Sequence, residues 1–428
     1  MLGPWSVRGP RSVVHPLVHP SSLRGTKDQG PRPGLRIGLA ASITAAAVVL
    51  SSSPGQAHKP ITSPYTYNED VFPLLHDRCG RCHVSGGVAP MSLMTHADTV
   101  PWGESIKTEL LAGSMPPWSV DSSPGRFRNV EGLTAREMNV LLTWVTGGTP
   151  LGDDNKGPKP TAIDTAWRLG APDLTVQMPS PFSLNADTRE TTAEFTLATG
   201  LRERRLVRAV DLQPGTPSIV RAATVSVKST GAPGTDGVER VLALWLPGDD
   251  PVPLDQGFGF ELPAGAELTL RVLYRKTWEY ERKEMTDRST LGIYFADANA
   301  APVDRIDFSG TFAGTPNSGV ELGRVLDRDI RALAIYPESR VPAGTSVRAI
   351  ARRPDGSTVD LIAFHPRPDW ERRYWFTEPI ALPKGSRINI SAKIDDEGPL
   401  LPLSTAPAAS TRVDPSSLRV TLDVVAAR

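Results

Sequence analysis

The second part of this 428-residue sequence is a succession of short β-forming runs separated by turn residues. Runs rich in Val, Leu, Ile, Thr and aromatic residues recur at 194–197, 224–227, 241–245, 267–272, 291–295, 346–350 and 387–390. Turn segments built on Pro and Gly lie between them at 214–215, 263–265, 342–344, 354–356 and 383–385. This spacing is typical of antiparallel β-sandwiches, and residues 157–428 are enough for two of them.

The two cysteines of the chain lie together in Cys79-Gly80-Arg81-Cys82-His83, the C-x-x-C-H pattern of c-type haem attachment. Two thiols at this spacing reach the two vinyl groups of one haem, and the adjacent imidazole can coordinate the iron. A disulfide, a redox-active C-x-x-C pair and half of a zinc site are the alternatives. Zinc would require a second ligand pair and a thioredoxin-like motif a βαβ setting, and the sequence offers neither. One covalently bound haem c is therefore predicted.

Helical patterns flank this motif. Apolar residues at 71–75 lead into Cys79, and Asn68-Glu69-Asp70 is the expected capping start. Residues 134–145 form a second helical pattern, in which Thr134 and Glu137 are spaced as a capping box. We therefore expect a small helical region around the motif.

The order of helix, C-x-x-C-H, a loop with Met115 before two prolines and a closing helix resembles a class I cytochrome c domain over residues 60–150. The resemblance implies that His83 is the proximal iron ligand and Met115 the distal one. His96 is the main alternative, and bis-imidazole ligation would give a lower potential than His/Met ligation. Met91 and Met94 are better suited to packing under the haem edge.

A second resemblance covers about residues 165–428. It rests on short segments in a fixed order, at 171–174, 211–215, 286–289, 353–356 and 378–388. They resemble bacterial proteins in which cytochrome c is fused to an ascorbate-dependent type II copper monooxygenase module. That module is the tandem jelly-roll pair of the peptidylglycine hydroxylases, and it would imply two copper centres that hydroxylate a C–H bond.

The copper ligands of that family are missing from this chain. Such centres need several imidazoles and a thioether, but residues 157–428 contain a single histidine, His365. Arg221-Ala222 stands where the resemblance would place a His pair. We therefore expect no copper, and a Ser-His-Asp set cannot be assembled either. No catalytic residue is predicted.

The leader indicates export. An apolar stretch at 37–50 follows Arg32 and Arg36 and precedes small residues at Gly55 and Ala57, which is a signal-peptide layout. The stretch is short for the roughly 20 residues that cross a bilayer, although an uncleaved N-terminal anchor remains an alternative. We expect a periplasmic protein.

The charge balance argues against nucleic acid as a partner. Residues 1–57 hold six Lys or Arg and one acid, so the rest carries 41 bases against 46 acids (47 minus 6, and 47 minus 1). A mildly acidic body without a Lys/Arg run is a poor match for a polyanion.

The fold class predicted from the sequence is therefore multidomain, with a small all-α cytochrome c domain followed by two all-β antiparallel sandwich domains of the jelly-roll type. The expected segments are a leader with signal peptide at 1–57, the monohaem domain at 58–152, a linker at 153–164, and sandwiches at 165–300 and 301–428.

The sequence favours an exported monohaem c-type cytochrome that transfers single electrons, with the copper-free sandwiches as docking or scaffold modules. Redox partner proteins are expected, and a membrane-associated electron-transfer complex is among the candidates. A cytochrome-coupled monooxygenase-like oxidoreductase and a structural subunit of a larger electron-transfer complex are the alternatives. An electron carrier is favoured over a catalytic monooxygenase.

Overall fold

The structure is a computed structural model of the whole chain. It describes residues 62–117, 126–128, 132–159, 162–163, 165–228, 239–312, 319–341, 345–366, 371–394 and 417–427. All of these belong to one compact unit, Pro60–Arg428. The expected signal peptide lies outside the described residues.

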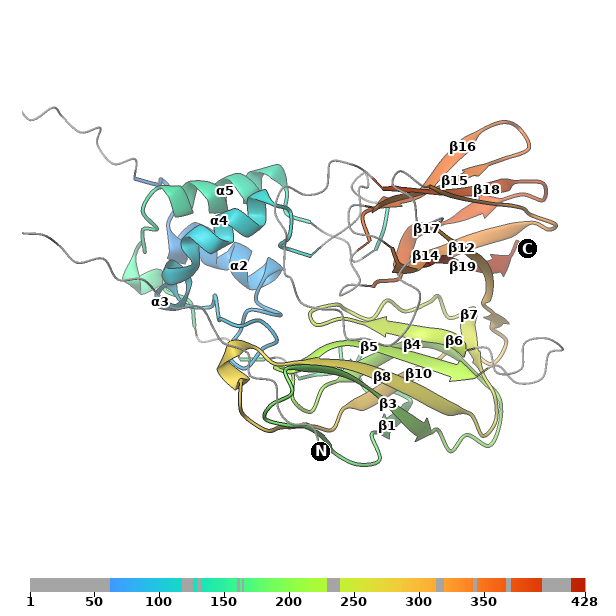
Figure 1. Cartoon of the computed structure of the whole chain (residues 1–428), viewed down its shortest axis with the longest axis horizontal. Coiled ribbons are helices and arrows are strands. Elements are labelled where there is room, and N and C mark those ends of the chain that lie inside the picture. Colours follow the sequence, from blue (N-terminus) through green and yellow to red (C-terminus); the bar gives the residue numbers. More distant parts are fainter. Residues whose placement is uncertain are drawn as a thin grey trace, which may run out of the picture. The chain divides into compact units, whose positions relative to one another are not determined.

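The helices lie before the sheets in the sequence, apart from one short turn, η4 (Figure 1). They are η1 (Tyr67–Val71), α2 (Phe72–Arg78), α3 (His96–Thr99), η2 (Val100–Trp102), α4 (Gly103–Leu111), α5 (Ala135–Thr146), η3 (Asp154–Lys156) and η4 (Trp278–Tyr280). Among the described residues, no helix is both long and apolar enough to cross a membrane.

The capping prediction is confirmed at α5 and wrong at the first helix. The Thr134 hydroxyl accepts a hydrogen bond from the Glu137 amide at 3.2 Å, and the Glu137 carboxylate accepts one from the Thr134 amide at 2.7 Å. At the first helix the preceding cap is Thr66, whose side chain makes no capping bond. Asn68 lies inside η1 and donates its side-chain amide to the carbonyl of Asp153 at 2.9 Å. The polar residue therefore anchors a later segment rather than the helix start.

The helices surround a small apolar core. Tyr67, Leu75 and Trp144 are its largest fully buried side chains. The Tyr67 hydroxyl donates to the carbonyl of Leu93 at 3.0 Å, and the Trp144 indole donates to the carbonyl of Pro150 at 3.0 Å. These bonds satisfy the polar ends of two large buried rings and fix the loops that follow the motif and α5.

The first group of strands forms a five-stranded sheet in the order β1-β10-β4-β7-β11, a four-stranded sheet β3-β8-β5-β6 and the pair β2-β9. Their bounds are β1 (Leu174–Gln177), β2 (Phe182–Leu184), β3 (Glu190–Ala198), β4 (Arg205–Gln213), β5 (Val220–Lys228), β6 (Glu239–Trp245), β7 (Phe258–Leu262), β8 (Glu267–Arg275), β9 (Met285–Asp287), β10 (Thr290–Phe295) and β11 (Ala301–Pro302). The pairing is antiparallel except between β11 and β7. Side chains from the two larger sheets share one apolar core.

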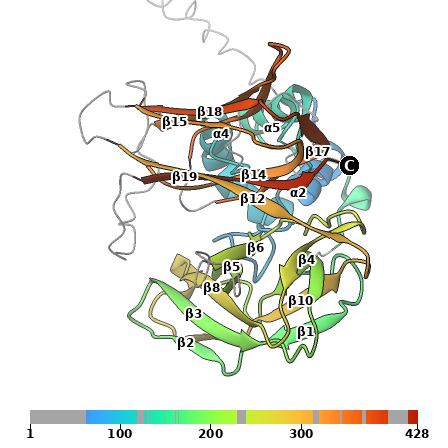
Figure 2. The same cartoon turned by 90° about the vertical axis from the view of Figure 1, so that its right-hand side faces the viewer.

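The second group forms two four-stranded sheets, in the orders β12-β19-β14-β17 and β13-β18-β15-β16. Their bounds are β12 (Asp304–Thr311), β13 (Val320–Val325), β14 (Ile330–Arg340), β15 (Thr345–Arg352), β16 (Thr358–Phe364), β17 (Tyr374–Leu382), β18 (Arg387–Ile394) and β19 (Ser417–Ala426). Figure 2 shows β15 and β18 in one layer facing β12, β14 and β19 in the other. A third apolar core fills the space between the layers.

The expected fold class is wrong. Strands hold 43% of the structure and helices 15%, and the described residues show no distinct all-α cytochrome domain. A separate helical domain was expected because sequence patterns report local structure. In the structure, long-range contacts join the helical segment to the sheets. Phe127 pairs with Phe376 of β17 as an isolated β-bridge and belongs to the core of the second sandwich. The motif also contacts the loop after β6, through hydrogen bonds from Arg81 and Cys82. Such long-range contacts cannot be read from local sequence patterns.

Candidate functional site

A single turn brings together three of the predicted site residues. Cys79 ends α2, and its amide donates to the carbonyl of Leu75 at 2.9 Å. The carbonyl of Cys79 then accepts hydrogen bonds from the amides of Cys82 at 3.1 Å and His83 at 2.8 Å. The chain thus reverses tightly after the helix, and both cysteines and the histidine follow within this turn.

Gly80 is required by the close packing of this turn. A Cβ at this position would lie 2.5 Å from the carbonyl oxygen of His76 and 3.2 Å from the sulfur of Met94. The first distance is shorter than any real carbon–oxygen contact, so a larger residue would push the turn away from α2. The same geometry places the buried Met94 thioether beside the motif.

Both cysteines are free thiols and half-buried. Burial raises the pKa of Cys79 to about 12 and that of Cys82 to about 11, and the nearby Asp249 carboxylate raises the latter further. Both therefore stay protonated at neutral pH. A protonated, half-buried thiol is a poor nucleophile, which disfavours a thiol–disulfide catalyst that needs a low-pKa cysteine.

Among the described residues, a hydrogen-bond partner is seen for one ring nitrogen of His83. Its Nδ1 lies 3.3 Å from the carbonyl oxygen of Met91, so Nδ1 carries the proton and donates it. Burial lowers the pKa of His83, which keeps the ring neutral. A neutral imidazole whose Nδ1–H binds a carbonyl presents the Nε2 lone pair, the arrangement of metal-bound histidines.

The alternative candidates for the second iron ligand lie in different surroundings. His96 packs between the rings of Tyr67 and Trp144, and its Nε2 lies 2.8 Å from the carbonyl of Thr149. This contact makes His96 part of the helical core. Met91 packs against the same core and Met94 belongs to it. Their expected position under a haem edge stays a prediction.

Met115 lies apart from this core. It follows α4, is 39% exposed, and its amide lies 3.4 Å from the carbonyl of Glu109. The structure therefore brings Cys79, Cys82 and His83 together but records no contact that joins the described part of the Met115 turn to them. Trp118, three residues after Met115, lies outside the described residues.

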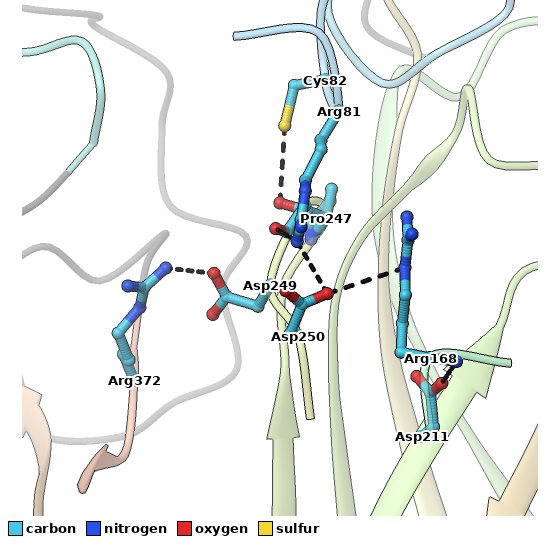
Figure 3. Close-up of polar contacts among 9 residues, drawn as sticks. Arg81, Cys82, Arg168, Asp211, Pro247, Asp249, Asp250 and Arg372 are labelled. Carbon is cyan, nitrogen blue, oxygen red and sulfur yellow. Dashed lines mark hydrogen bonds and ion pairs between the residues drawn. The ribbon is translucent and has the colours of Figure 1, made fainter. Parts of the chain in front are cut away.

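The loop after β6 covers the motif (Figure 3). The Cys82 thiol donates to the carbonyl of Pro247 at 3.4 Å, and the Arg81 guanidinium donates to the carbonyl of Gly248 at 3.0 Å. Gly248 has a φ of +82°, and a Cβ on it would lie 3.2 Å from the Cys82 sulfur. Glycine therefore permits both the left-handed backbone and the close approach to the thiol.

Two aspartates of the same loop form ion pairs with three arginines. Asp250 pairs with Arg81 at 2.7 Å and with Arg168 at 3.6 Å, while Asp249 pairs with Arg372 (Figure 3). Burial raises the pKa of Asp249 to about 6 despite its arginine partner. Asp249 and Arg372 also border a cavity of about 50 Å³. The loop therefore links the motif to both groups of strands.

The residues of the motif fit a covalently attached haem by their chemistry. Two free thiols can form thioethers, and His83 presents Nε2 as a neutral ligand. By contrast, the described residues contain no group of three or more His, Cys, Asp or Glu close enough to hold a bare metal ion.

Comparisons with known proteins give matches among solved structures alone. No family model matches the chain, and no curated protein matches it. Among solved structures, a protein described as an α-L-fucosidase from Bacteroides ovatus is 12% identical over 51% of this chain, with a TM-score of 0.18, and the chain spans 36% of that protein.

Two further solved structures are equally remote. The major capsid protein P2 of bacteriophage PM2 is 12% identical, and the match covers 51% of this chain and 100% of P2 with a TM-score of 0.20. The tandem CBM22 domains of Xyn10C from Paenibacillus barcinonensis are 10% identical, with 61% and 96% coverage and a TM-score of 0.16. TM-scores this far below 0.5 carry no argument about fold or function.

The two family resemblances inferred from the sequence are therefore wrong. No cytochrome c or copper monooxygenase family model matches, and the structure is mostly β-sandwich with short helices. The segments on which the second resemblance rested are turns and strand ends that many β proteins share. The motif Cys79–His83 does not depend on these resemblances, because its chemistry follows from its own residues.

The sequence analysis missed the residues that cover the motif. Pro247-Gly248-Asp249-Asp250 could be read only as a turn between strands. Its contact with Cys82 joins residues 165 positions apart, so no local signal could have revealed it.

Proposed function

We propose that this chain binds one haem c through Cys79 and Cys82 and transfers single electrons. His83 is the proposed axial ligand. The observation that carries the proposal is the hydrogen bond from His83 Nδ1 to the carbonyl of Met91, because it leaves Nε2 free next to two free thiols. When bound, the haem would supply one-electron redox chemistry.

The chain's own residues have three roles in this proposal. The two thiols anchor the haem, and His83 stays neutral because it is buried. Met94 and the rest of the helical core exclude water from one side of the motif. Met115 is proposed as the second axial ligand on its sequence position alone.

The proposal includes export and a protein partner. The apolar leader at 37–50 supports export to the periplasm, where haem is attached to such motifs. The β-sandwiches would serve as docking or scaffold modules for redox partner proteins. Fractionation of cells that produce the full chain, with the haem signal followed in the periplasmic fraction, tests the location.

The attachment is tested by producing the full chain in a bacterium with periplasmic haem-attachment machinery and denaturing it. We expect haem to stay with the wild-type polypeptide and to be lost completely in the Cys79→Ala/Cys82→Ala variant. His76→Ala is the matched control, because His76 lies one turn before the motif and its ring contacts the exposed Asp77 and the Phe72 ring rather than a cysteine. Retention of haem by the double cysteine variant, or its absence from the wild type, contradicts the proposal.

The second axial ligand is tested by the ferric absorption spectrum. Met115→Ala should open the sixth position and change the spectrum, whereas Met94→Ala should leave the ligand bands in place because Met94 is a core residue. An unchanged spectrum in Met115→Ala would show that another residue occupies the sixth position.

A further inference from the structure

The Phe127 segment, residues 126–128, belongs to the connection between α4 and α5 at 112–134. Helix–helix connections usually need about 2–8 residues, and much longer ones are uncommon unless they carry a function. This connection leaves the helical core, because Phe127 belongs to the core of the second sandwich. The extra length of chain therefore serves a contact outside the helical segment.

Two backbone hydrogen bonds add the Phe127 segment to β17 as a short antiparallel strand. The Thr377 amide donates to the carbonyl of Arg126 at 2.9 Å, and the Arg128 amide donates to the carbonyl of Trp375 at 2.8 Å. β17 is the last strand in the sheet order β12-β19-β14-β17, so this pairing covers an edge that the named strands leave open. The pattern is that of strand addition, in which an extended peptide binds the edge of a sheet.

An aromatic side chain anchors the segment. Phe127 is 7% exposed, and its ring centre lies 5.4 Å from that of Phe376, with the two planes 27° apart, and 5.5 Å from that of Tyr374. Pro379 lies two residues after Thr377 and has no amide hydrogen to donate, so the pairing cannot continue far along β17. The edge therefore accommodates one aromatic residue and the backbone on either side of it.

The Phe127 segment is held weakly enough to be released. Burial of one Phe side chain and two hydrogen bonds favour the paired form, whereas fixing the backbone of three residues opposes it. These contributions are similar in size, so we expect an open form in about 1–10% of the molecules. By contrast, β14 and β19 pair with each other over most of their length, and their hydrogen bonds should open only with the whole sandwich.

We propose that the edge of β17 is a strand-addition site for an extended segment with a central aromatic residue, and that the Phe127 segment occupies it as a releasable latch. When the latch opens, the rings of Tyr374 and Phe376 and the edge of β17 become available to such a segment of a partner protein. The latch and the partner compete for one site, so binding of the partner also frees the connection that carries Met115. This inference does not depend on haem binding.

The test uses the full chain and a fluorescently labelled peptide of residues 123–131, which contains Phe127. Phe127→Ala removes the anchor of the latch, so this variant should bind the peptide with a Kd of about 0.01–0.1 mM. That value follows from a millimolar effective concentration of the linked segment and a closed form favoured about 10- to 100-fold. The wild type should bind the peptide at least about tenfold more weakly, because its site is mostly occupied.

Two controls accompany this measurement. Phe195→Ala removes a partly buried Phe from the first sandwich and should bind the peptide like the wild type. The same peptide with Ala in place of Phe127 should not bind the Phe127→Ala chain. Equal affinity of Phe127→Ala and the wild type for the peptide, or binding of the alanine peptide, overturns the inference.

Hydrogen exchange of the wild type tests the latch without any variant, and it decides the inference if Phe127→Ala does not fold. The amides of Arg128 and Thr377 should exchange about tenfold faster, or more, than the paired amides of β19, because they open with the latch. Exchange at the same rate as in β19 would show that the segment is a fixed part of the sandwich and would contradict a releasable latch.

Discussion

The helical segment and the β region differ in what their residues do. In the described part of the chain, the helical core has 11 buried apolar residues, whereas each of the two β cores has 25. Yet the helical segment carries both cysteines and His83, and the β region carries only one histidine, His365. Most buried apolar residues thus lie in the β region, whereas the motif residues lie in the helical segment. The smaller core gains support from the loop after β6, which binds the motif directly.

The largest expected effect is on the small helical core. Trp144→Ala removes a fully buried indole and its hydrogen bond to Pro150, at a cost of about 3–5 kcal/mol. Because the β cores do not contain Trp144, hydrogen exchange should accelerate in α2 and α5 while β8 and β18 keep their protection. Equal loss of protection in all four elements would show that the two regions unfold as one unit.

The next largest effect on the free energy of unfolding is expected from a buried ion pair in the β region. Arg373 pairs with Asp423 at 3.0 Å, and its guanidinium lies 4.8 Å from the centre of the Tyr336 ring. Arg373→Met leaves the Asp423 carboxylate buried without its partner, which should cost about 3 kcal/mol in denaturant unfolding at pH 7. Protection in the helical segment should change less. A cost below about 1 kcal/mol would show that the pair is dispensable.

Titration of Asp423 should also make the stability of the β region depend on pH. Burial raises the pKa of Asp423 from 3.8 to about 6, so between these values the folded chain holds a proton that the unfolded chain has released. Stability from this group is therefore greatest at low pH and falls as pH rises through about 4 to 6, by up to about 3 kcal/mol.

Asp423→Asn, which cannot titrate, isolates this contribution. The unfolding free energy of the wild type relative to the variant should decline between pH 4 and pH 6.5 and stay level above that. A difference that rises with pH would mean that Arg373 outweighs the burial of the carboxylate.

The capping box of α5 should contribute less to the free energy of unfolding than the buried ion pair does. Thr134→Ala removes one half of the capping box and should cost about 1 kcal/mol, read from hydrogen exchange in α5. Thr146→Ala, in the last turn of the same helix, is the control and should change the free energy by less than about 0.5 kcal/mol. Comparable effects at both positions would argue against a specific role of the cap.

The smallest effect on stability is expected for the ion pair between Arg81 of the motif and Asp250 of the loop after β6. Arg81 and Asp250 are both nearly half-exposed, so Asp250→Ala should cost below about 1 kcal/mol, and less still in high salt. The contact between loop and motif would then depend on the hydrogen bonds that the carbonyls of Pro247 and Gly248 accept from the motif. A large, salt-sensitive loss would instead assign the contact to the ion pair.

Local patterns located many elements correctly. The runs at 267–272 and 387–390 lie inside β8 and β18, and the capping box at Thr134 starts α5. The three motif residues share one turn because they are neighbours in the sequence. Such features depend only on nearby residues, and these are what a sequence reports most directly.

Features that depend on distant residues were missed. The bond between Cys82 and Pro247, the buried Arg373 among aromatic rings, and the bridge between Phe127 and Phe376 all join separate parts of the chain. Asn68 was misassigned for the same reason, because its partner is Asp153. The family resemblances failed because they rested on short turn segments, whose residues are dictated by turn geometry in many folds.

The central claim is that the C-x-x-C-H turn holds one haem. Its most direct test is the amount of iron and copper in the full chain, produced with haem-attachment machinery, offered copper and then denatured. We expect one iron per chain that stays with the polypeptide as haem, and negligible copper. Iron that is absent or lost on denaturation, or stoichiometric copper without iron, would contradict it.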